Sequence, residues 1–243
     1  MTSDVLPDIS VVVPVHDESG AAVPLAREIA QAFAGRSYEM IFVDDASRDS
    51  TLAELRAAMA DLPALRVLAH GANAGQSRAV RTGVLAARAP IIVTLDGDGQ
   101  NPPHDGPRLA DALAAAPPDV ALVGGVRARR QDTGAKKWAS LWANRIRKRL
   151  LGDDADDTGC GLKAFRRDAF LALPYFDHIH RYLPALMIRE GFQNRYLDVD
   201  HRHRETGRSK YTNWGRLMAS WSDLQGVMWL KTRSRRPGAV TEF

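Results

Sequence analysis

The sequence predicts an α/β fold in which a mainly parallel sheet carries helices on its faces. Three observations support this: short apolar runs rich in β-branched residues recur in the first half of the chain, stretches with helical periodicity separate them, and acidic residues follow several of the runs. Such runs are typical of strands buried on both faces, and their alternation with helices is typical of parallel sheets. A chain of 243 residues is long enough for a sizeable single core or for one domain with an appendage.

Five strands and four helices are expected between residues 9 and 123. The expected strands are Ile9–Val15, Tyr38–Val43, Leu65–Leu68, Ile91–Leu95 and Val120–Val123. The expected helices are Ala21–Phe33, Ser50–Met59, Gln76–Ala87 and Leu109–Ala115. The crossover connections between the strands should be right-handed.

Asp96 and Asp98, which follow the apolar run Ile91–Leu95, are the most informative residues of the chain. Open α/β sheets bind their ligands at the carboxyl ends of their strands. Two carboxylates at this spacing can converge on one hard divalent cation, and Gly97 between them lets the backbone turn tightly. Taken alone, such a motif could also be an acidic turn that binds no metal. The residues and motifs around it therefore decide between the two interpretations.

Acidic residues also follow the first two predicted strands. Asp17 and Glu18 come after the first strand, and Asp44 and Asp45 end the second. Because the carboxyl ends of parallel strands share one edge of the sheet, these four residues should line one crevice together with Asp96 and Asp98. Neither G-x-G-x-x-G nor G-x-x-x-x-G-K-[ST] occurs, which argues against dehydrogenases and P-loop enzymes. A nucleotide held through carboxylates and a metal fits better.

The net charge of +4 hides a polarised chain. Residues 1–120 contain 9 Lys and Arg against 16 Asp and Glu, whereas residues 121–243 contain 24 against 13. This asymmetry indicates an anionic partner for the C-terminal half: phosphates, nucleic acid or an acidic membrane surface. The single cysteine, Cys160, excludes an internal disulfide and is expected to be a small buried residue in a reducing compartment. No signal peptide is apparent.

Two stretches beyond residue 125 have the pattern of amphipathic helices that lie on a membrane surface. Lys136–Leu151 and Trp214–Leu230 both combine tryptophans on an apolar stripe with many cations, and an ordinary core-facing helix is the alternative for each. Arg216 and Asp223 interrupt the second stretch, so we expect it to lie on a bilayer rather than to cross it.

Six motifs occur in a fixed order between residues 9 and 215. They are Val13–Glu18, Val43–Thr51, Asn73–Gly83, Leu95–Pro103, Asp157–Arg167 and Arg204–Tyr211. They resemble the motifs of glycosyltransferase family 2, and the fourth, D-x-D-x-Q-x-P-P, resembles its polyprenyl-phosphate branch, typified by dolichol-phosphate mannose synthase. Asp17 departs from this pattern, because the family usually has asparagine there.

The resemblance implies a GT-A type fold and an inverting, metal-dependent enzyme. Such an enzyme moves a hexose, mannose or glucose, from a nucleotide sugar (GDP-mannose or a UDP-hexose) to a polyprenyl phosphate. That acceptor is already ionised, so it needs no strong base to attack the sugar. The implied location is the cytoplasmic face of the membrane, with peripheral attachment, as a homodimer or beside a separate membrane protein. The catalytic domain would span residues 1–212, the membrane-associating helix residues 213–236, and a disordered tail residues 237–243.

The resemblance also assigns residues to the donor and the metal. The residues that would hold the nucleotide sugar are Pro14, Val15, Glu18, Asp45, Asp96, Gln100 and Ser209. The residues that would bind Mg²⁺ or Mn²⁺ are Asp96, Asp98 and Gln100.

Further residues are assigned to the phosphates and to catalysis. The acceptor phosphate would meet Arg127, Arg130, Lys136 and Ser140. Arg204, Ser209 and Lys210 would close over the donor diphosphate from a mobile loop. The catalytic set is Asp96, Asp98, Arg127, Arg204 and Lys210.

Besides a catalytically dead scaffold that only binds a nucleotide sugar, which the intact pair Asp96 and Asp98 opposes, two alternatives remain open from the sequence. A family 2 enzyme with a saccharide or other non-lipid acceptor would need a carboxylate base, for which Asp157 is the candidate. A non-catalytic module that binds an anionic surface or nucleic acid would explain the basic half of the chain. No nucleic-acid-binding motif supports that module and the acidic strand ends oppose it, so nucleic acid is not an expected partner.

Overall fold

The computed structural model describes residues 6–127, 149–153, 155, 157, 159–202, 213–233 and 241, without the side chains of residues 213–220. The strands are β1 (Ile9–Val15), β2 (Tyr38–Asp44), β3 (Leu65–Ala69), β4 (Ile91–Thr94), β5 (Val120–Arg127), β6 (Lys163–Arg166) and β7 (Gln193–Val199). The helices are α1 (Ala22–Ala32), α2 (Thr51–Ala58), α3 (Gln76–Ala86), α4 (Gly106–Ala114), α6 (Arg167–Ala172), α7 (Leu183–Glu190) and α8 (Asn213–Thr232). Two short 3₁₀ turns are η1 (Pro103–Asp105) and η2 (Ile179–Arg181).

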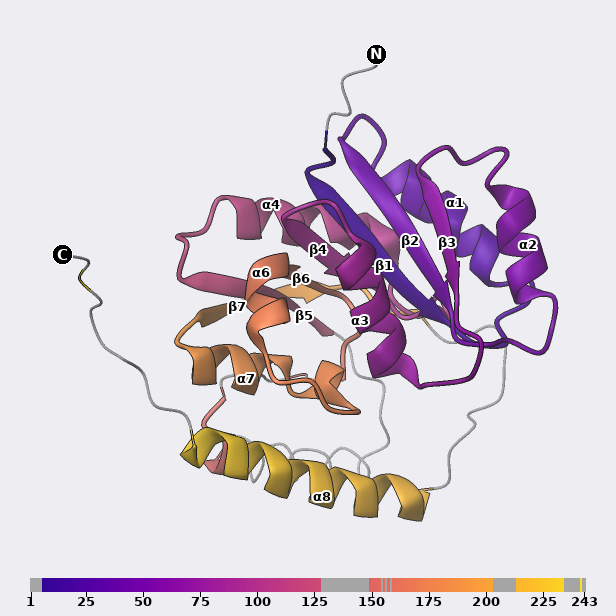
Figure 1. The fold of residues 1–243 in the computed structure, drawn as a ribbon. Helices are drawn as coiled ribbons and strands as arrows, with labels where there is room; N and C mark the ends of the chain where they lie inside the picture. The colour runs from indigo at the N-terminus through magenta and orange to yellow at the C-terminus, as the bar shows by residue number, and fades with distance from the viewer. Residues whose placement is uncertain are drawn as a thin grey trace.

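The described strands form one sheet in the order β3-β2-β1-β4-β6-β5-β7 (Figure 1). β1 pairs in parallel with β2 and β4, and β2 with β3, which confirms the predicted parallel half. β6 is antiparallel to both β4 and β5, so β5 runs in the same direction as β4. The carboxyl ends of β1, β2, β4 and β5 therefore share one edge of the sheet.

All five predicted strands and all four predicted helices are present, with ends shifted by a few residues. β6 and β7 were not predicted from the sequence. β6 has four residues that begin and end with a cation, and β7 is an edge strand whose exposed and partly buried residues alternate. Neither is a continuous apolar run, which is the pattern that identifies a central parallel strand.

Two apolar layers hold the sheet, one on each face. Val11 and Val13 of β1 pack with α1, α2 and α4 on one face, and Val12 packs with α3, α6 and α7 on the other. All three valines are fully buried. The alternation along β1 follows from the twofold periodicity of a strand, and it fixes which helices flank the site at the end of that strand.

α8 lies against α7 on the outer side of the second layer (Figure 1). Val227 is fully buried in this contact, the Arg189 guanidinium donates to the Leu230 carbonyl at 3.1 Å, and His178 Nδ1 lies 2.8 Å from Asp223 Oδ2. The predicted helix of the second tryptophan-bearing stretch is thereby confirmed. Of the first stretch, the structure describes only residues 149–151.

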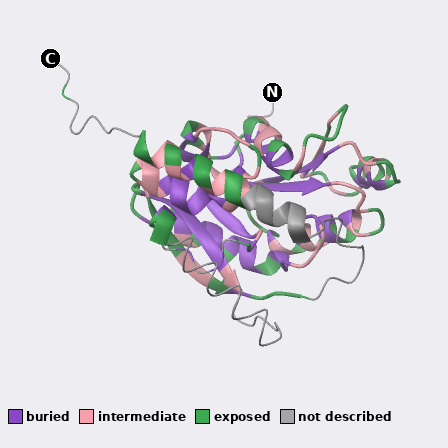
Figure 2. Cartoon of the chain, turned by 90° about the horizontal axis from the view of Figure 1, so that it is seen from below, coloured by how far each residue is buried: buried purple, intermediate pink, exposed green. Residues whose placement is uncertain are grey.

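The outward face of α8 carries exposed aromatic side chains. Trp221 and Trp229 are 58% and 59% exposed, and the outer side of this helix is largely exposed where it is described (Figure 2). Among the described helices, none is both long and apolar enough to cross a bilayer.

Candidate active site

The turn that carries Asp96 and Asp98 lies directly against the end of β1. A Cβ on Gly97 would stand 2.7 Å from the Pro14 carbonyl oxygen and 2.7 Å from Val15 Cγ1, so only glycine allows this approach. At the next strand, the Asp45 N–H donates to the Val15 carbonyl at 2.9 Å. The structure therefore brings the ends of β1, β2 and β4 together, as the acidic strand ends predicted.

The three predicted metal ligands follow one another on a single short turn. Asp98 Oδ1 accepts the Gln100 N–H at 3.1 Å, and Gly99 has a φ of 70°. Two carboxylates and an amide oxygen are the hard ligands that Mg²⁺ and Mn²⁺ prefer. The residues present therefore fit a divalent cation, and their assignment as its ligands stays a prediction.

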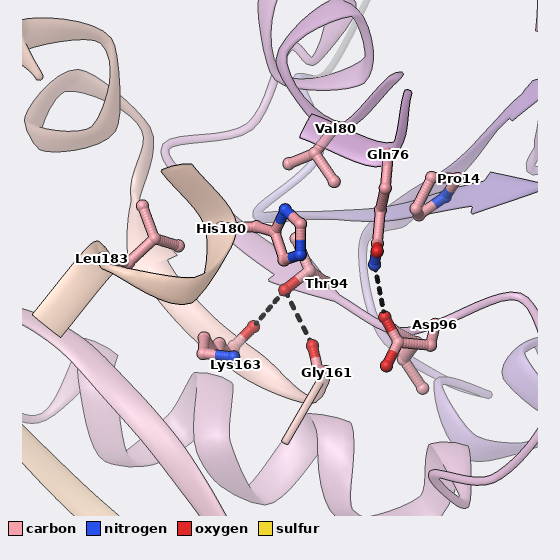
Figure 3. Close-up of a pocket in the computed structure, with 10 residues that line it drawn as sticks. Pro14, Gln76, Val80, Thr94, Asp96, Gly161, Lys163, His180 and Leu183 are labelled. Carbon is pink, nitrogen blue, oxygen red and sulfur yellow. Dashed lines mark hydrogen bonds between the residues drawn. The ribbon is translucent and has the colours of Figure 1, made fainter. Parts of the chain in front are cut away.

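Asp96 is confined from two sides, by α3 and by the chain before β6. Gln76 Nε2 donates to Asp96 Oδ1 at 2.8 Å (Figure 3). On the other side, a Cβ on Gly161 would stand 2.1 Å from Asp96 Oδ2, so the glycine lets the chain pass against the carboxylate. Thr94 fastens this passage, because its hydroxyl donates to the Gly161 carbonyl at 3.1 Å.

The charges around Asp96 oppose one another. Burial and the neighbouring Asp98 raise the pKa of Asp96, while Lys163, the Gln76 amide and Arg127 act to lower it. A bound cation would favour the ionised carboxylate, as metals do at carboxylate sites.

Lys163 is a buried cation at the start of β6. The residue is 5% exposed, and its Nζ donates to the Cys160 carbonyl. Burial lowers the pKa of Lys163, whereas Cys160, Asp96 and Asp157 act to raise it. Cys160 is 1% exposed, and burial raises the pKa of its thiol, which confirms the expected small buried residue.

A small pocket opens beside Asp96, with about 310 Å³ of space that includes open solvent at its mouth. Gln76, Lys163 and His180 are among its lining residues (Figure 3). His180 Nδ1 lies 2.7 Å from the buried Ser77 hydroxyl of α3. Burial, helped by the cations Arg181 and Lys163, lowers the pKa of His180 to about 3, so the ring is neutral at ordinary pH.

Arg127 and Asp157 meet at the end of β5. Arg127 Nε donates to Asp157 Oδ2 at 2.6 Å, and Nη2 donates to Oδ1 at 2.8 Å. Such two-point pairing fixes the plane of the guanidinium. Arg127 therefore lies at the carboxyl edge of the sheet, as predicted, and its charge acts to lower the pKa of Asp96.

Asp45 organises the loop between β3 and α3. Its Oδ1 accepts the Ala74 N–H at 2.9 Å and lies 2.7 Å from His70 Nδ1, while its Oδ2 accepts the Gly75 N–H at 2.7 Å. Both carboxylate oxygens are thus used to hold the start of α3. A contact from Asp45 to the nucleotide stays a prediction, as do those from Pro14, Val15 and Glu18.

Asp17, which departs from the family pattern, ties two loops together. It has a φ of 52°, its Oδ1 accepts the Arg48 N–H at 2.7 Å, and its own N–H donates to the Ser47 hydroxyl at 2.9 Å. An asparagine oxygen could accept the same bond, so the substitution conserves this contact.

Residues 10–173 match the family model described as Glycosyl transferase family 2, which is more than half of the chain. The chain belongs to glycosyltransferase family 2. Its fold agrees with two solved enzymes. The glucosyl-3-phosphoglycerate synthase of Mycobacterium tuberculosis gives a TM-score of 0.66 at 20% identity, over 98% of this chain and 84% of that one. A mannosyltransferase of Pyrobaculum calidifontis in complex with GDP-Man and Mn²⁺ gives a TM-score of 0.64 at 20% identity, over 97% of this chain and 67% of that one. The predicted GT-A type fold is confirmed.

Closer relatives within family 2 are named for transfer to polyprenyl phosphates. An undecaprenyl-phosphate 4-deoxy-4-formamido-L-arabinose transferase of Shewanella sediminis is 35% identical over 84% of this chain. A dodecaprenyl-phosphate galacturonate synthase of Rhizobium johnstonii is 33% identical over 95% of this chain. The chain spans 61% and 69% of the lengths of these two proteins. The predicted family and branch resemblance is confirmed.

Several residues that the resemblance to family 2 nominated lie outside the described residues. They are Arg130, Lys136, Ser140, Arg204, Ser209 and Lys210. Arg202 is the last described residue before the part of the chain that holds the last three of these, and its N–H donates to the Gln100 carbonyl at 2.9 Å. That contact fixes Arg202 to the turn that carries the predicted metal ligands.

A second group of potential metal ligands lies at η1 and the end of β7. It consists of His104, Asp105 and Asp200. Asp105 already pairs with Arg108 at 3.1 Å and accepts the Asp200 N–H at 2.8 Å, while His104 and Asp200 are exposed. The positive charge of Arg108 beside Asp105 disfavours a bound metal. We therefore interpret the group as a set of contacts that connects η1 to the end of β7.

Sequence reasoning gave no role to Gln76, Lys163 or His180, which line the pocket beside Asp96. Lys163 lies within the motif Asp157–Arg167, and Gln76 lies within the motif Asn73–Gly83. These positions were the available signal, but only the fold brings them to one carboxylate.

Proposed function

We propose that this chain catalyses an inverting transfer of a sugar from a nucleotide sugar to a polyprenyl phosphate. The observation that carries the proposal is the carboxyl edge of the sheet, where Asp96 and Asp98 stand beside Lys163 and Arg127. The names of the relatives support the acceptor. Mannose and glucose are the proposed sugars.

The acidic pair suits the donor half of this reaction. Mg²⁺ or Mn²⁺ on Asp96, Asp98 and Gln100 would neutralise the charge that develops on the leaving nucleoside diphosphate. Pro14 and Val15 border this turn and are proposed to hold the nucleotide, together with Glu18, which lies beyond the end of β1, and Asp45, which directly follows β2.

The Arg127–Asp157 pair suits the acceptor half. An ionised lipid phosphate attacks the anomeric carbon without giving up a proton, so no general base is required. Both oxygens of Asp157 accept hydrogen bonds from Arg127, and this favours a carboxylate that orients the arginine over one that takes a proton. Arg127 is proposed to face the acceptor phosphate. The saccharide-acceptor alternative, which needs Asp157 as base, is less well supported.

The outward face of α8 is proposed to rest on the cytoplasmic surface of the membrane. Trp221 and Trp229 are exposed there, and the Arg233 guanidinium lies 5.8 Å from the Trp229 ring centre. Tryptophan favours the headgroup depth of a bilayer, and cations favour anionic lipid. Attachment at this face would present the sheet's site to a lipid-borne acceptor.

The transferase activity is tested with the purified chain, undecaprenyl phosphate in lipid vesicles and a panel of nucleotide sugars. The panel contains GDP-mannose, UDP-glucose and UDP-galacturonate, each with Mn²⁺, with Mg²⁺ or with EDTA. We expect a sugar-phosphate lipid and equimolar nucleoside diphosphate with at least one donor, and neither product in EDTA. Turnover that is equal without the lipid phosphate would overturn the proposed acceptor.

The membrane contact is tested by flotation with vesicles of phosphatidylglycerol or of phosphatidylcholine. The wild-type chain should float with the anionic vesicles, and the double change Trp221→Ala, Trp229→Ala should reduce the bound fraction. Leu85→Ala removes a similarly exposed apolar side chain from α3, at 54% exposure, and serves as the matched control. Equal flotation of all three proteins would contradict the proposed role of α8.

A further inference from the structure

Gln76 connects α3 to the acidic turn at the end of β4. It is the first residue of α3, and its Nε2 donates to Asp96 Oδ1 at 2.8 Å (Figure 3). The contact joins residues 20 positions apart in the sequence. An amide is a neutral donor, so it holds the carboxylate without supplying a competing charge.

The other side of Asp96 is closed by the chain. Gly161 lies so near that a Cβ there would overlap Asp96 Oδ2 at 2.1 Å. The carboxylate therefore has an amide donor at one oxygen and a backbone wall at the other. Loss of the amide would leave one side without the contact that selects the side-chain rotamer.

Gln76 itself stands on a fixed support. The N–H of the preceding residue, Gly75, donates to Asp45 Oδ2 at 2.7 Å, and the hydroxyl of the following residue, Ser77, lies 2.7 Å from His180 Nδ1. Asp45 directly follows β2, and His180 belongs to η2. The start of α3 is thus tied on both sides of Gln76, which is what a residue that orients another needs.

We propose that Gln76 is a positioning residue that holds Asp96 in the orientation in which it binds a divalent cation. The inference rests on the proposed metal site but does not require that any particular sugar be transferred. Groups that orient metal ligands through hydrogen bonds typically contribute about 10–100-fold in metal affinity. Removal of the amide should lower the affinity for the cation by a factor in this range.

The inference is tested by titration of the purified protein with Mn²⁺, with free Mn²⁺ followed by electron paramagnetic resonance, in the presence and absence of UDP. The test variants are Gln76→Met, which keeps the length of the side chain without its amide, and Gln76→Ala. Gln31→Ala, at an exposed position of α1, is the matched control. Circular dichroism and thermal unfolding without metal establish that each variant is folded.

The wild-type protein and Gln31→Ala should bind Mn²⁺ alike. Both Gln76 variants should bind it about 10–100-fold more weakly, with an unchanged melting temperature in the absence of metal. In a turnover assay the Mn²⁺ concentration at half-maximal rate should rise, whereas kcat at saturating Mn²⁺ should stay near that of the wild type. A structural role alone would instead lower the metal-free melting temperature.

The outcomes separate this inference from the proposed function. Wild-type Mn²⁺ affinity in folded Gln76→Met and Gln76→Ala overturns the inference, whatever the activity. Weakened binding in both variants supports it even if no nucleotide sugar in the panel is consumed. A wild-type protein that binds no Mn²⁺ with or without UDP overturns both the inference and the proposed metal site.

Discussion

Arg127 and Asp157 form a two-point ion pair at the end of β5, with Nε–Oδ2 and Nη2–Oδ1 distances of 2.6 and 2.8 Å. The Asp157 side chain is 7% exposed and the Arg127 side chain 17%, so water screens the pair weakly. The pair places an oriented cation on the same edge as Asp96.

Changes to this pair distinguish the two kinds of acceptor. Arg127→Ala should lower kcat/KM by about 100-fold or more, because it removes charge stabilisation at the phosphates. Asp157→Asn leaves one oxygen to accept from Arg127, and should cost less than about tenfold, which is below the usual contribution of a general base. Steady-state rates with undecaprenyl phosphate give both numbers. If Asp157→Asn lowered kcat/KM by several hundredfold, and if this loss disappeared at high pH, Asp157 would act as a general base. That result would favour the saccharide-acceptor enzyme.

Gly161→Ala should disable the site without unfolding the protein. The new Cβ would overlap Asp96 Oδ2 at 2.1 Å, so the carboxylate must turn away from its position. We expect weaker Mn²⁺ binding, measured by calorimetry, and a large loss of turnover. Gly71→Ala is the control, because a Cβ at Gly71 meets nothing within 4 Å. Unaltered Mn²⁺ binding in Gly161→Ala would show that the position of Asp96 is unimportant.

Glu39 should stabilise the fold away from the site. It is 3% exposed and accepts hydrogen bonds from the Ser10 hydroxyl at 2.7 Å, the Arg88 N–H at 2.7 Å and the Arg66 guanidinium. Burial alone would raise the pKa of Glu39, but the Arg88 N–H, Ser10 and Arg66 outweigh it, and the pKa lies below 4.5. Glu39→Gln should cost about 1.5–3 kcal/mol of unfolding free energy at pH 7, as lost charged hydrogen bonds do.

The pH dependence of Glu39 follows from the lowered pKa. Its contribution is fully present above the unfolded value near 4.5, and it is lost as the pH falls through the lower folded value. Urea unfolding at pH 7 and below pH 4 should therefore show a smaller difference between wild type and Glu39→Gln in acid. Asp61→Asn, at an exposed position, is the matched control. A difference that grows in acid would contradict the assignment.

His180 should make the fold sensitive to a different pH range. Its folded pKa is about 3 against 6.5 unfolded, so the unfolded chain binds the extra proton between these values. The unfolding free energy should fall by about 1.4 kcal/mol per pH unit below pH 6.5 from this group. His180→Gln should therefore show a shallower decline of the unfolding free energy than wild type, measured by urea unfolding between pH 6.5 and pH 4. Parallel declines in the two proteins would show that His180 protonates freely in the folded state.

The parallel half of the sheet and the acidic strand ends could be predicted from the sequence, because buried strands leave continuous apolar runs and the chain places Asp96 at the end of one. β7 could not, since an edge strand such as Gln193–Val199 exposes alternate polar residues. The buried Lys163 also escapes a hydropathy pattern, because its burial depends on the carboxylates around it.

The detailed site depends on contacts that periodicity cannot report. Gln76 reaches Asp96 across 20 residues, and Arg127 reaches Asp157 across 30. A pattern of apolar residues indicates which face is buried, but it does not indicate which loops meet at the sheet edge. The roles of Asp45 and Asp17 in holding loops likewise became apparent only from their hydrogen bonds.

The most direct test of the account compares wild type with Asp98→Ala in a lipid-phosphate glycosylation assay, with the lipid product identified by mass spectrometry. Wild type with Mn²⁺ should form the sugar-phosphate lipid from at least one nucleotide sugar and should stop in EDTA. Asp98→Ala should remain folded and lose about 100-fold or more of this rate, as expected when charge stabilisation at the leaving group is removed. Full turnover by Asp98→Ala would contradict the account.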